Sequence, residues 1–183
     1  MTNGCVEPNC QTRGVRVGWF GFSAARDASI GRPEPYVRLE AIDLASASRS
    51  TEVDIWNPGF AFATPSLASN CNERRCDLAI AIGTGGGGRY GETAVGFGYD
   101  WLVYITSTST ATQIFDCRAS AAAAPVWCAR FGDYYNVTRA RSPTGTGMWF
   151  GTFAYGVLAS TPGQPCWIGG CAADPHYVAF GHD

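Results

Sequence analysis

The chain has 183 residues, of which 46% are hydrophobic and only 15% charged, a composition that suits one globular domain rather than a disordered chain. Thirteen basic residues against fifteen acidic ones leave a net charge of −2, which gives no electrostatic basis for binding nucleic acid or an anionic membrane. The bases are all arginines, which excludes a Schiff-base or P-loop lysine, and the only histidines are His176 and His182. We therefore expect neither a metal centre nor a cofactor.

The hydrophobic pattern predicts strands along the whole chain. In YVRLEAIDL at 36–44, apolar and polar residues alternate, and Val37, Leu39, Ala41 and Asp43 share one face. No window shows the 3.6-residue apolar repeat of an amphipathic helix. The predicted strands are 15–22, 36–44, 51–56, 61–68, 77–82, 93–98, 101–106, 112–116, 134–140, 148–158 and 177–180.

The strands fall into three groups, at 14–56, 57–117 and 130–183, within a single all-β domain at 1–183 that begins with a disulfide loop at 1–13. Groups of several strands that recur about every 45–55 residues are typical of β-propeller blades. This rhythm alone does not separate a propeller from a disulfide-rich β-sandwich or β-barrel.

The eight cysteines form four local pairs. Local pairs favour disulfides that close short loops, and hence an extracellular or periplasmic location. The alternative is zinc, because two of these C-x4-C motifs could supply a four-cysteine site. The predicted pairs are Cys5 with Cys10, Cys71 with Cys76, Cys117 with Cys128, and Cys166 with Cys171.

The sequence MTNGCVEPNC at 1–10 lacks the basic start and apolar core of a signal peptide, and no apolar stretch is long enough to span a membrane. We therefore expect a mature form or a piece of a longer protein. The lack of lysine and the abundance of alanine, arginine and glycine indicate a GC-rich bacterial gene. The glycosylation sequon at Asn136 is then expected to be unmodified.

Several motifs occur in the order seen in bacterial sialidase-like (BNR-type) β-propellers. PYVRLEAIDLASASRSTEVDIWNPGFAFATPSLASN at 35–70 resembles a blade junction, and DLAIAIGTGGGG at 77–88 resembles the strand and turn that follow. RFGDYY at 130–135 with MWFGT at 148–152 resembles a late blade, and PHYVAFG at 175–181 resembles the terminal strand. The resemblance covers residues 14–183 and implies the C-terminal blades of a propeller.

The chain departs from that family in two respects. About three blades are present, whereas closed propellers have about four to eight, so the arc either belongs to a longer ring or is completed by association of copies. The arginine triad, the Tyr–Glu nucleophile pair and the S-x-D-x-G-x-T-W box are not found in the sequence. The resemblance thus implies architecture more than hydrolysis.

Three segments contain candidate ligand-binding residues. A glycine run at 85–88 precedes Arg89 and Tyr90; it lacks the lysine of a phosphate loop and predicts a tight turn between strands. A polar and aromatic cluster at 130–135 has the residue types to bind a sugar, although the pattern favours a structural corner. Trp127 and Trp167 lie in or beside cysteine-closed loops. The candidates are Arg89, Tyr90, Trp127, Arg130, Asp133, Tyr134, Tyr135 and Trp167.

Catalytic patterns are weak. The S-T-S triplet near 107–109 would need a glutamate further along the chain to indicate an ADP-ribosyltransferase, and no glutamate follows Glu92. A Ser-His-Asp triad is disfavoured because no G-x-S-x-G motif occurs. The carboxylates available for glycoside hydrolysis are Glu40, Glu52, Asp54, Glu92 and Asp133, and their spacing singles out no pair.

The sequence therefore predicts a secreted, non-catalytic binding or adhesion module that recognises a glycan or a protein surface. Two alternatives stay open. One is a sialidase-related glycoside hydrolase. The other is a self-assembling structural subunit, a homo-oligomer whose exposed strand edges pair.

Overall fold

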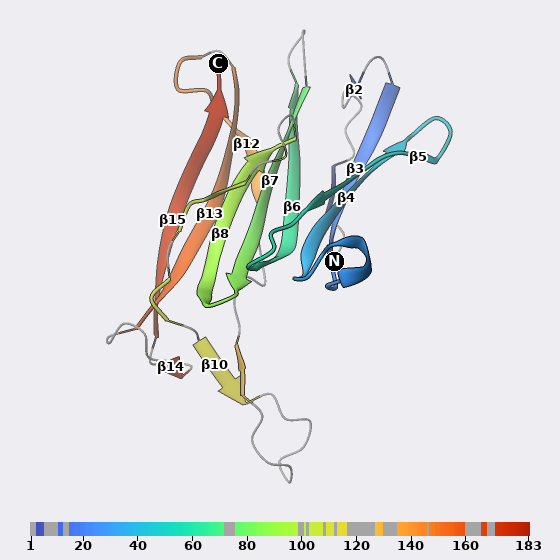
Figure 1. The fold of residues 1–183 in the computed structure, drawn as a ribbon. Coiled ribbons are helices and arrows are strands. Elements are labelled where there is room, and N and C mark those ends of the chain that lie inside the picture. The colour runs from blue at the N-terminus through green and yellow to red at the C-terminus, as the bar shows by residue number, and fades with distance from the viewer. Residues whose placement is uncertain are drawn as a thin grey trace.

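Strands make up nearly all of the regular structure of this protein. The computed structural model describes residues 3–5, 11–12, 15–71, 76–98, 101, 103–107, 109–111, 113–116, 127–129, 135–145, 147–159, 166–167 and 171–183. Within these residues, strands are accompanied by a single 3₁₀-helix and by no α-helix. The same residues include no helix with the length and apolar character that crossing a membrane requires. Three larger sheets stand side by side, in the order in which the chain forms them (Figure 1).

The N-terminal sheet has one buried face and one polar face. In β4, Val37, Leu39 and Ala41 are buried while Arg38 and Glu40 turn outward, as the alternating sequence predicts. A 3₁₀-helix, η1 (Ala28–Ile30), lies between β3 and β4. The antiparallel order is β1-β3-β4-β5, with β2 paired to β3; the strands are β1 (Asn3–Cys5), β2 (Gln11–Thr12), β3 (Val15–Ala24), β4 (Tyr36–Asp43) and β5 (Ser48–Ile55).

The middle sheet is covered on both faces, which explains the nearly continuous apolar run in β7. There, Ile80 and Ile82 pack toward the N-terminal sheet, whereas Ala79 and Ala81 pack toward the C-terminal sheet. A strand that is buried on both sides loses the alternation that marks a half-exposed strand. The sheet is an antiparallel meander of β6 (Ala61–Cys71), β7 (Cys76–Gly86), β8 (Arg89–Phe97) and β9 (Val103–Ile105).

The C-terminal sheet is dominated by one long antiparallel pair. Strands β13 and β15 stay in register from the pair of Met148 and His182 to the pair of Ala159 and Cys171. The sheet order is β12-β13-β15, with β12 (Val137–Ala140), β13 (Met148–Ala159) and β15 (Cys171–His182).

A fourth, small sheet lies beyond the ends of the larger ones (Figure 1). Its central strand pairs antiparallel with one neighbour and parallel with the other. The order is β11-β10-β14, with β10 (Gln113–Asp116), β11 (Trp127–Ala129) and β14 (Cys166–Trp167).

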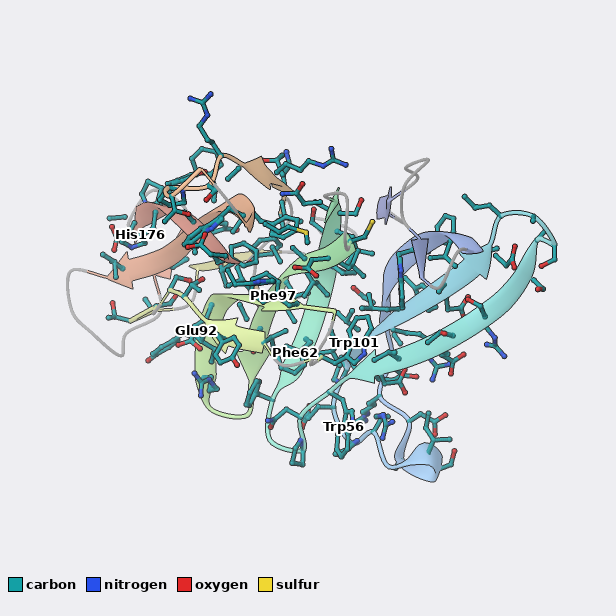
Figure 2. The ribbon with its side chains drawn as sticks, turned by 90° about the horizontal axis from the view of Figure 1, so that it is seen from above. Trp56, Phe62, Glu92, Phe97, Trp101 and His176 are labelled. Carbon is teal, nitrogen blue, oxygen red and sulfur yellow. The ribbon has the colours of Figure 1, made fainter. Side chains whose placement is uncertain are left out.

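Two apolar cores join the three larger sheets. One core lies between the N-terminal and middle sheets and includes Phe62. Trp19 and Trp101 pack against this core, with their ring centroids 5.3 Å apart. The other lies between the middle and C-terminal sheets and includes Phe97 and Phe150. Figure 2 shows Phe62 and Trp101 on one side of the middle sheet and Phe97 on the other.

Each predicted strand overlaps an observed one, and the predicted all-β class is confirmed. The short strands β1, β2, β11 and β14 were not predicted, because two or three residues are too few to show a period. Residues 113–116, which the sequence grouped with the second set of strands, form β10, and this strand pairs with β11 and β14. The predicted glycine turn is present between β7 and β8, where Gly87 and Gly88 both have positive φ.

Candidate binding surface

The outer face of the C-terminal sheet carries aromatic side chains that none of the other described sheets covers. On β13, Met148, Phe150 and Thr152 are buried, and two of them belong to the core shared with the middle sheet. Because successive residues of a strand point to opposite faces, the intervening Trp149 and Phe153 belong to the outer face. The register adds the outer-face positions Thr138, Ala140, Gly151, Tyr177, Ala179 and Gly181.

Two aromatic rings on this face lie across glycines of the neighbouring strand. A Cβ atom added to Gly151 would overlap the hydroxyl of Tyr177 and would approach its Cζ within 2.8 Å. A Cβ added to Gly181 would lie 2.6 Å from Cγ and Cδ2 of Trp149. Each ring therefore occupies space that a glycine leaves free, and it rests on the sheet instead of projecting from it.

A third aromatic ring stands nearly upright beside them. Phe153 lies opposite Tyr177 in the register, with ring centroids 5.9 Å apart and ring planes at 72°. Phe153 is 69% exposed and Tyr177 is 63% exposed. We refer to Trp149, Phe153 and Tyr177, with Gly151 and Gly181 beneath them, as the aromatic face.

A carboxylate marks one end of the aromatic face. Oδ1 of Asp183 accepts hydrogen bonds from the hydroxyl of Thr144 at 2.7 Å and from the indole N–H of Trp149 at 3.3 Å. These two donors lower the pKa of Asp183, the Thr144 hydroxyl having the larger effect, so this end of the face is negatively charged at neutral pH.

The three larger sheets form a stack, and the N-terminal sheet at its other end has a different surface chemistry. On the outer face of the N-terminal sheet, Asp54 accepts hydrogen bonds from Nε of Arg38 at 2.8 Å and from Nε of Arg32 at 3.1 Å. Hydrogen bonds and charge from Arg38, and secondarily from Arg32, lower the pKa of Asp54, and the contact with Asp54 raises the pKa of Arg38. Arg49 bridges Glu40 and Glu52 beside them. This face is thus internally neutralised by ion pairs.

An exposed tryptophan also lies at this end, beyond β5 (Figure 2). The guanidinium of Arg32 sits 4.5 Å from the ring centroid of Trp56, which is 41% exposed. One face of this indole is therefore occupied by a cation from the chain itself.

Among the predicted ligand-binding residues, Arg89 and Tyr90 lie at the start of β8, next to the glycine turn. The guanidinium of Arg89 bonds to Glu92, with Nη2 to Oε2 at 2.6 Å, and lies 5.0 Å from the ring centroid of Phe60. Tyr90 is half-buried. The charge of Arg89 is therefore balanced within the fold.

Tyr135 lies in the interior rather than at the surface. It is 7% exposed and stacks on Tyr155 with ring centroids 6.4 Å apart. Burial raises its pKa well above the usual value for a tyrosine. This location suits the structural-corner interpretation of the 130–135 cluster better than a ligand contact.

The remaining predicted residues are only partly described. The backbones of Trp127 and Trp167 belong to β11 and β14, so the predicted loops have short strands at these positions. Strand β10 lies between them and pairs with both. Arg130, Asp133 and Tyr134 lie outside the described residues.

The described residues include part of the predicted cysteine pairs. Cys76 is disulfide-bonded. Cys71 lies directly opposite Cys76 at the end of the β6–β7 ladder, the position that the predicted pair requires. The pairing itself stays a prediction, as do the three other pairs. Among the described residues, no three His, Cys, Asp or Glu side chains are placed to hold a metal ion.

Both histidines contact an aspartate. His176, at the exposed part of β15 (Figure 2), lies 2.9 Å from Asp174. His182 contacts Asp77 of β7, and its ring meets Phe97 edge-on at 5.6 Å. The second pair joins the middle sheet to the C-terminal sheet.

Sequence reasoning missed the aromatic face, although a signal was present. In MWFGTFAYG at 148–156, residues of both parities are apolar or small, which indicates a strand buried on two faces. Among the described residues, another sheet covers one of these faces, and the second apolar set is the aromatic face.

Comparison with known proteins gives no match: no protein-family model, no curated protein and no solved structure is significantly similar to this chain.

Proposed function

We propose that this chain is a secreted, non-catalytic binding module that recognises a glycan through the aromatic face. One observation carries the proposal: the rings of Tyr177 and Trp149 rest across glycines of the neighbouring strand, on a sheet surface whose own outer-face positions are uncharged. Such a ring has one side against the sheet and the other side available for stacking. The apolar face of a sugar ring stacks on an aromatic ring, while its hydroxyl groups bond to polar groups nearby.

The size of the aromatic face fits a small ligand better than a protein partner. An aromatic side chain buries about 150–250 Å². At exposures of 69% and 63%, Phe153 and Tyr177 together offer roughly 250 Å². A stable protein interface buries about 800 Å² on each partner, so these rings cover only about a third of that area.

The proposed architecture is an arc of three propeller-like blades. Its support is that the three larger sheets pack face to face in chain order, and that each contains an antiparallel pair or meander of consecutive strands. The resemblance to sialidase-like propellers points to the same arrangement, and the local disulfides fit an extracellular or periplasmic location.

The described carboxylates give less support to the hydrolase alternative. Glycoside hydrolysis needs one carboxylic acid with a raised pKa and a second carboxylate close by. The pKa of Asp54 is lowered instead, and Glu40 and Glu52 share Arg49. Glu92 is held by Arg89.

Edge-to-edge self-assembly is also less favoured. β15 is an edge strand with Pro175 near its middle, and proline cannot donate a hydrogen bond to an added strand. β5 is an edge strand that carries Arg49, Glu52 and Asp54, and charged side chains disfavour pairing with another edge.

The proposal is tested by screening the purified chain against a broad glycan panel and measuring the affinity of the ligands found by calorimetry. Tyr177→Ala should weaken binding by about tenfold, because a lost aromatic contact is worth about 0.5–1.5 kcal/mol and about 1.4 kcal/mol is a factor of ten. Since Tyr177 is exposed, the melting temperature should change little.

Trp56→Ala is the matched control, because it removes an exposed aromatic ring from the other end of the stack. It should leave glycan affinity unchanged. If no glycan on the panel binds, the proposal is wrong. If Trp56→Ala weakens binding and Tyr177→Ala does not, the assignment to the aromatic face is wrong.

A further inference from the structure

We propose, resting on the glycan-binding function above, that the aromatic face takes an extended, uncharged polysaccharide that lies along β13 and β15, rather than a single sugar or an anionic one. Three features of the described residues carry this inference: the length of the face, its charge and its hydroxyl groups.

The aromatic face is longer than one sugar ring. Trp149 and Phe153 are four residues apart on β13, which at about 3.3 Å per residue separates their Cα atoms by about 13 Å. The hydroxyl end of the Tyr177 ring lies over Gly151, midway between them. Three rings therefore follow one another along the strand direction, and a chain of several linked sugars can contact all of them at once.

The charge distribution disfavours an anionic ligand. Every outer-face position in this part of β12, β13 and β15 holds an uncharged residue. These positions are Thr138 and Ala140 on β12, Trp149, Gly151 and Phe153 on β13, and Tyr177, Ala179 and Gly181 on β15. The nearest charge described at the end of the face is the Asp183 carboxylate, which accepts a hydrogen bond from the indole N–H of Trp149 and, like an ordinary aspartate, is negative at neutral pH. A uronate or sialate bound there would be repelled and would find no arginine on these positions to pair with.

The polar groups of the face suit a ligand rich in hydroxyls. Thr138 pairs with Gly151 in the β12–β13 register and is exposed. The hydroxyl of Tyr177 lies over the same glycine. A sugar stacked on this part of the face would therefore meet two hydroxyl groups, which both donate and accept hydrogen bonds.

The glycine beneath the ring supplies a precise test. In Gly151→Ala, the new Cβ would overlap the Tyr177 hydroxyl, and this ring can move away because it is exposed and its far end is flexible. The substitution thus lifts the ring without removing it. Gly18→Ala in β3 is the matched control, because its Cβ would approach a Leu44 side-chain carbon at 3.2 Å, far from the aromatic face.

The experiment measures affinities for neutral gluco- and chito-oligosaccharides of increasing length, and for sialylated oligosaccharides and oligogalacturonates, at low and high salt. We expect the affinity for the neutral series to rise about tenfold or more from disaccharide to the longest chain. It should change less than about twofold with salt, because no ion pair is formed. Gly151→Ala should lower it about tenfold, whereas Gly18→Ala should not.

The outcomes separate this inference from the proposed function. A preference for anionic sugars that weakens with salt, or equal affinity for a disaccharide and a long chain, overturns the inference and leaves glycan binding intact. Unchanged binding in Gly151→Ala also overturns the inference. If no sugar binds, and light scattering shows a dimer that dissociates in Tyr177→Ala, the aromatic face is a protein interface and the proposed function fails as well.

Discussion

Replacing Asp54 by asparagine should destabilise the protein by about 2 kcal/mol at neutral pH. The Asp54 side chain is 9% exposed and receives three hydrogen bonds, two from the guanidinium of Arg38 at 2.8 and 3.1 Å and one from Arg32 at 3.1 Å. A hydrogen bond to a charged group contributes about 1.5–3 kcal/mol. The expected loss is smaller than the sum of three such bonds, because both arginine side chains are more than one fifth exposed. Water can therefore replace part of the hydrogen bonding that the arginines lose.

The matched control is Glu52→Gln, on the same strand and the same face. The Glu52 side chain is 32% exposed; it lies 3.3 Å from Nη2 of Arg38 and also pairs with Arg49, and these two surface ion pairs together are worth about 1 kcal/mol. Urea unfolding followed by tryptophan fluorescence gives both free energies. If Asp54→Asn costs no more than Glu52→Gln, the reasoning from burial and bond count is refuted.

The same variant has a pH signature. Because the pKa of Asp54 is lower in the folded protein than the unfolded value of about 3.9, its ionised form stabilises the fold. This contribution is fully present above about pH 5 and is lost as the pH falls through the folded value. The stability difference between wild type and Asp54→Asn should therefore shrink in acid, and a difference that stays constant down to about pH 2 would contradict the assignment.

Three further substitutions test the packing of the β7–β8 turn and of the interior. Gly87→Ala should destabilise the fold by about 3 kcal/mol or more, because its Cβ would overlap the carbonyl oxygen of Gly59. Gly88→Ala should cost about 1 kcal/mol, because Gly88 also has a positive φ but has open space around it. Chemical denaturation measures both costs, and equal values would contradict this packing. Tyr135→Phe should cost at most about 1 kcal/mol at pH 7, because it removes a weak contact between the buried hydroxyl and the Thr93 side chain while the ring stays in place. Because burial raises the folded pKa of Tyr135, wild type should lose stability above about pH 10, where the unfolded tyrosine ionises, and a variant that loses just as much there would refute the role of this residue.

Much of the strand pattern was predictable because a strand that is buried on one face only shows this in the alternation of its own residues. β4 shows this directly: Val37, Leu39 and Ala41 are buried, and the charged residues between them are not. The glycine turn before Arg89 was also predictable, because two consecutive residues with positive φ nearly demand glycine. The positions of most strands along the chain were predictable from the same local signals.

The candidate site was not predictable in the same way. Arg89 and Tyr135 looked like ligand contacts because polar and aromatic residues cluster near them in the sequence. In the fold, Arg89 is neutralised by Glu92 and Tyr135 is buried against Tyr155. Neither partner could be identified from sequence spacing, since Tyr155 is brought to Tyr135 by the turn between β12 and β13.

The sequence by itself determined that this protein is all-β, where its main strands lie, and which side of β4 is buried, because these follow from periods of two residues and from local turn chemistry. Tertiary structure alone decided which apolar faces are covered. β7 and β13 both read as strands apolar on two sides, yet β7 lies between two sheets and β13 lies at the end of the stack. The difference depends on sheet-to-sheet packing between residues far apart in the chain, and it is why no other described sheet covers Trp149, Phe153 and Tyr177.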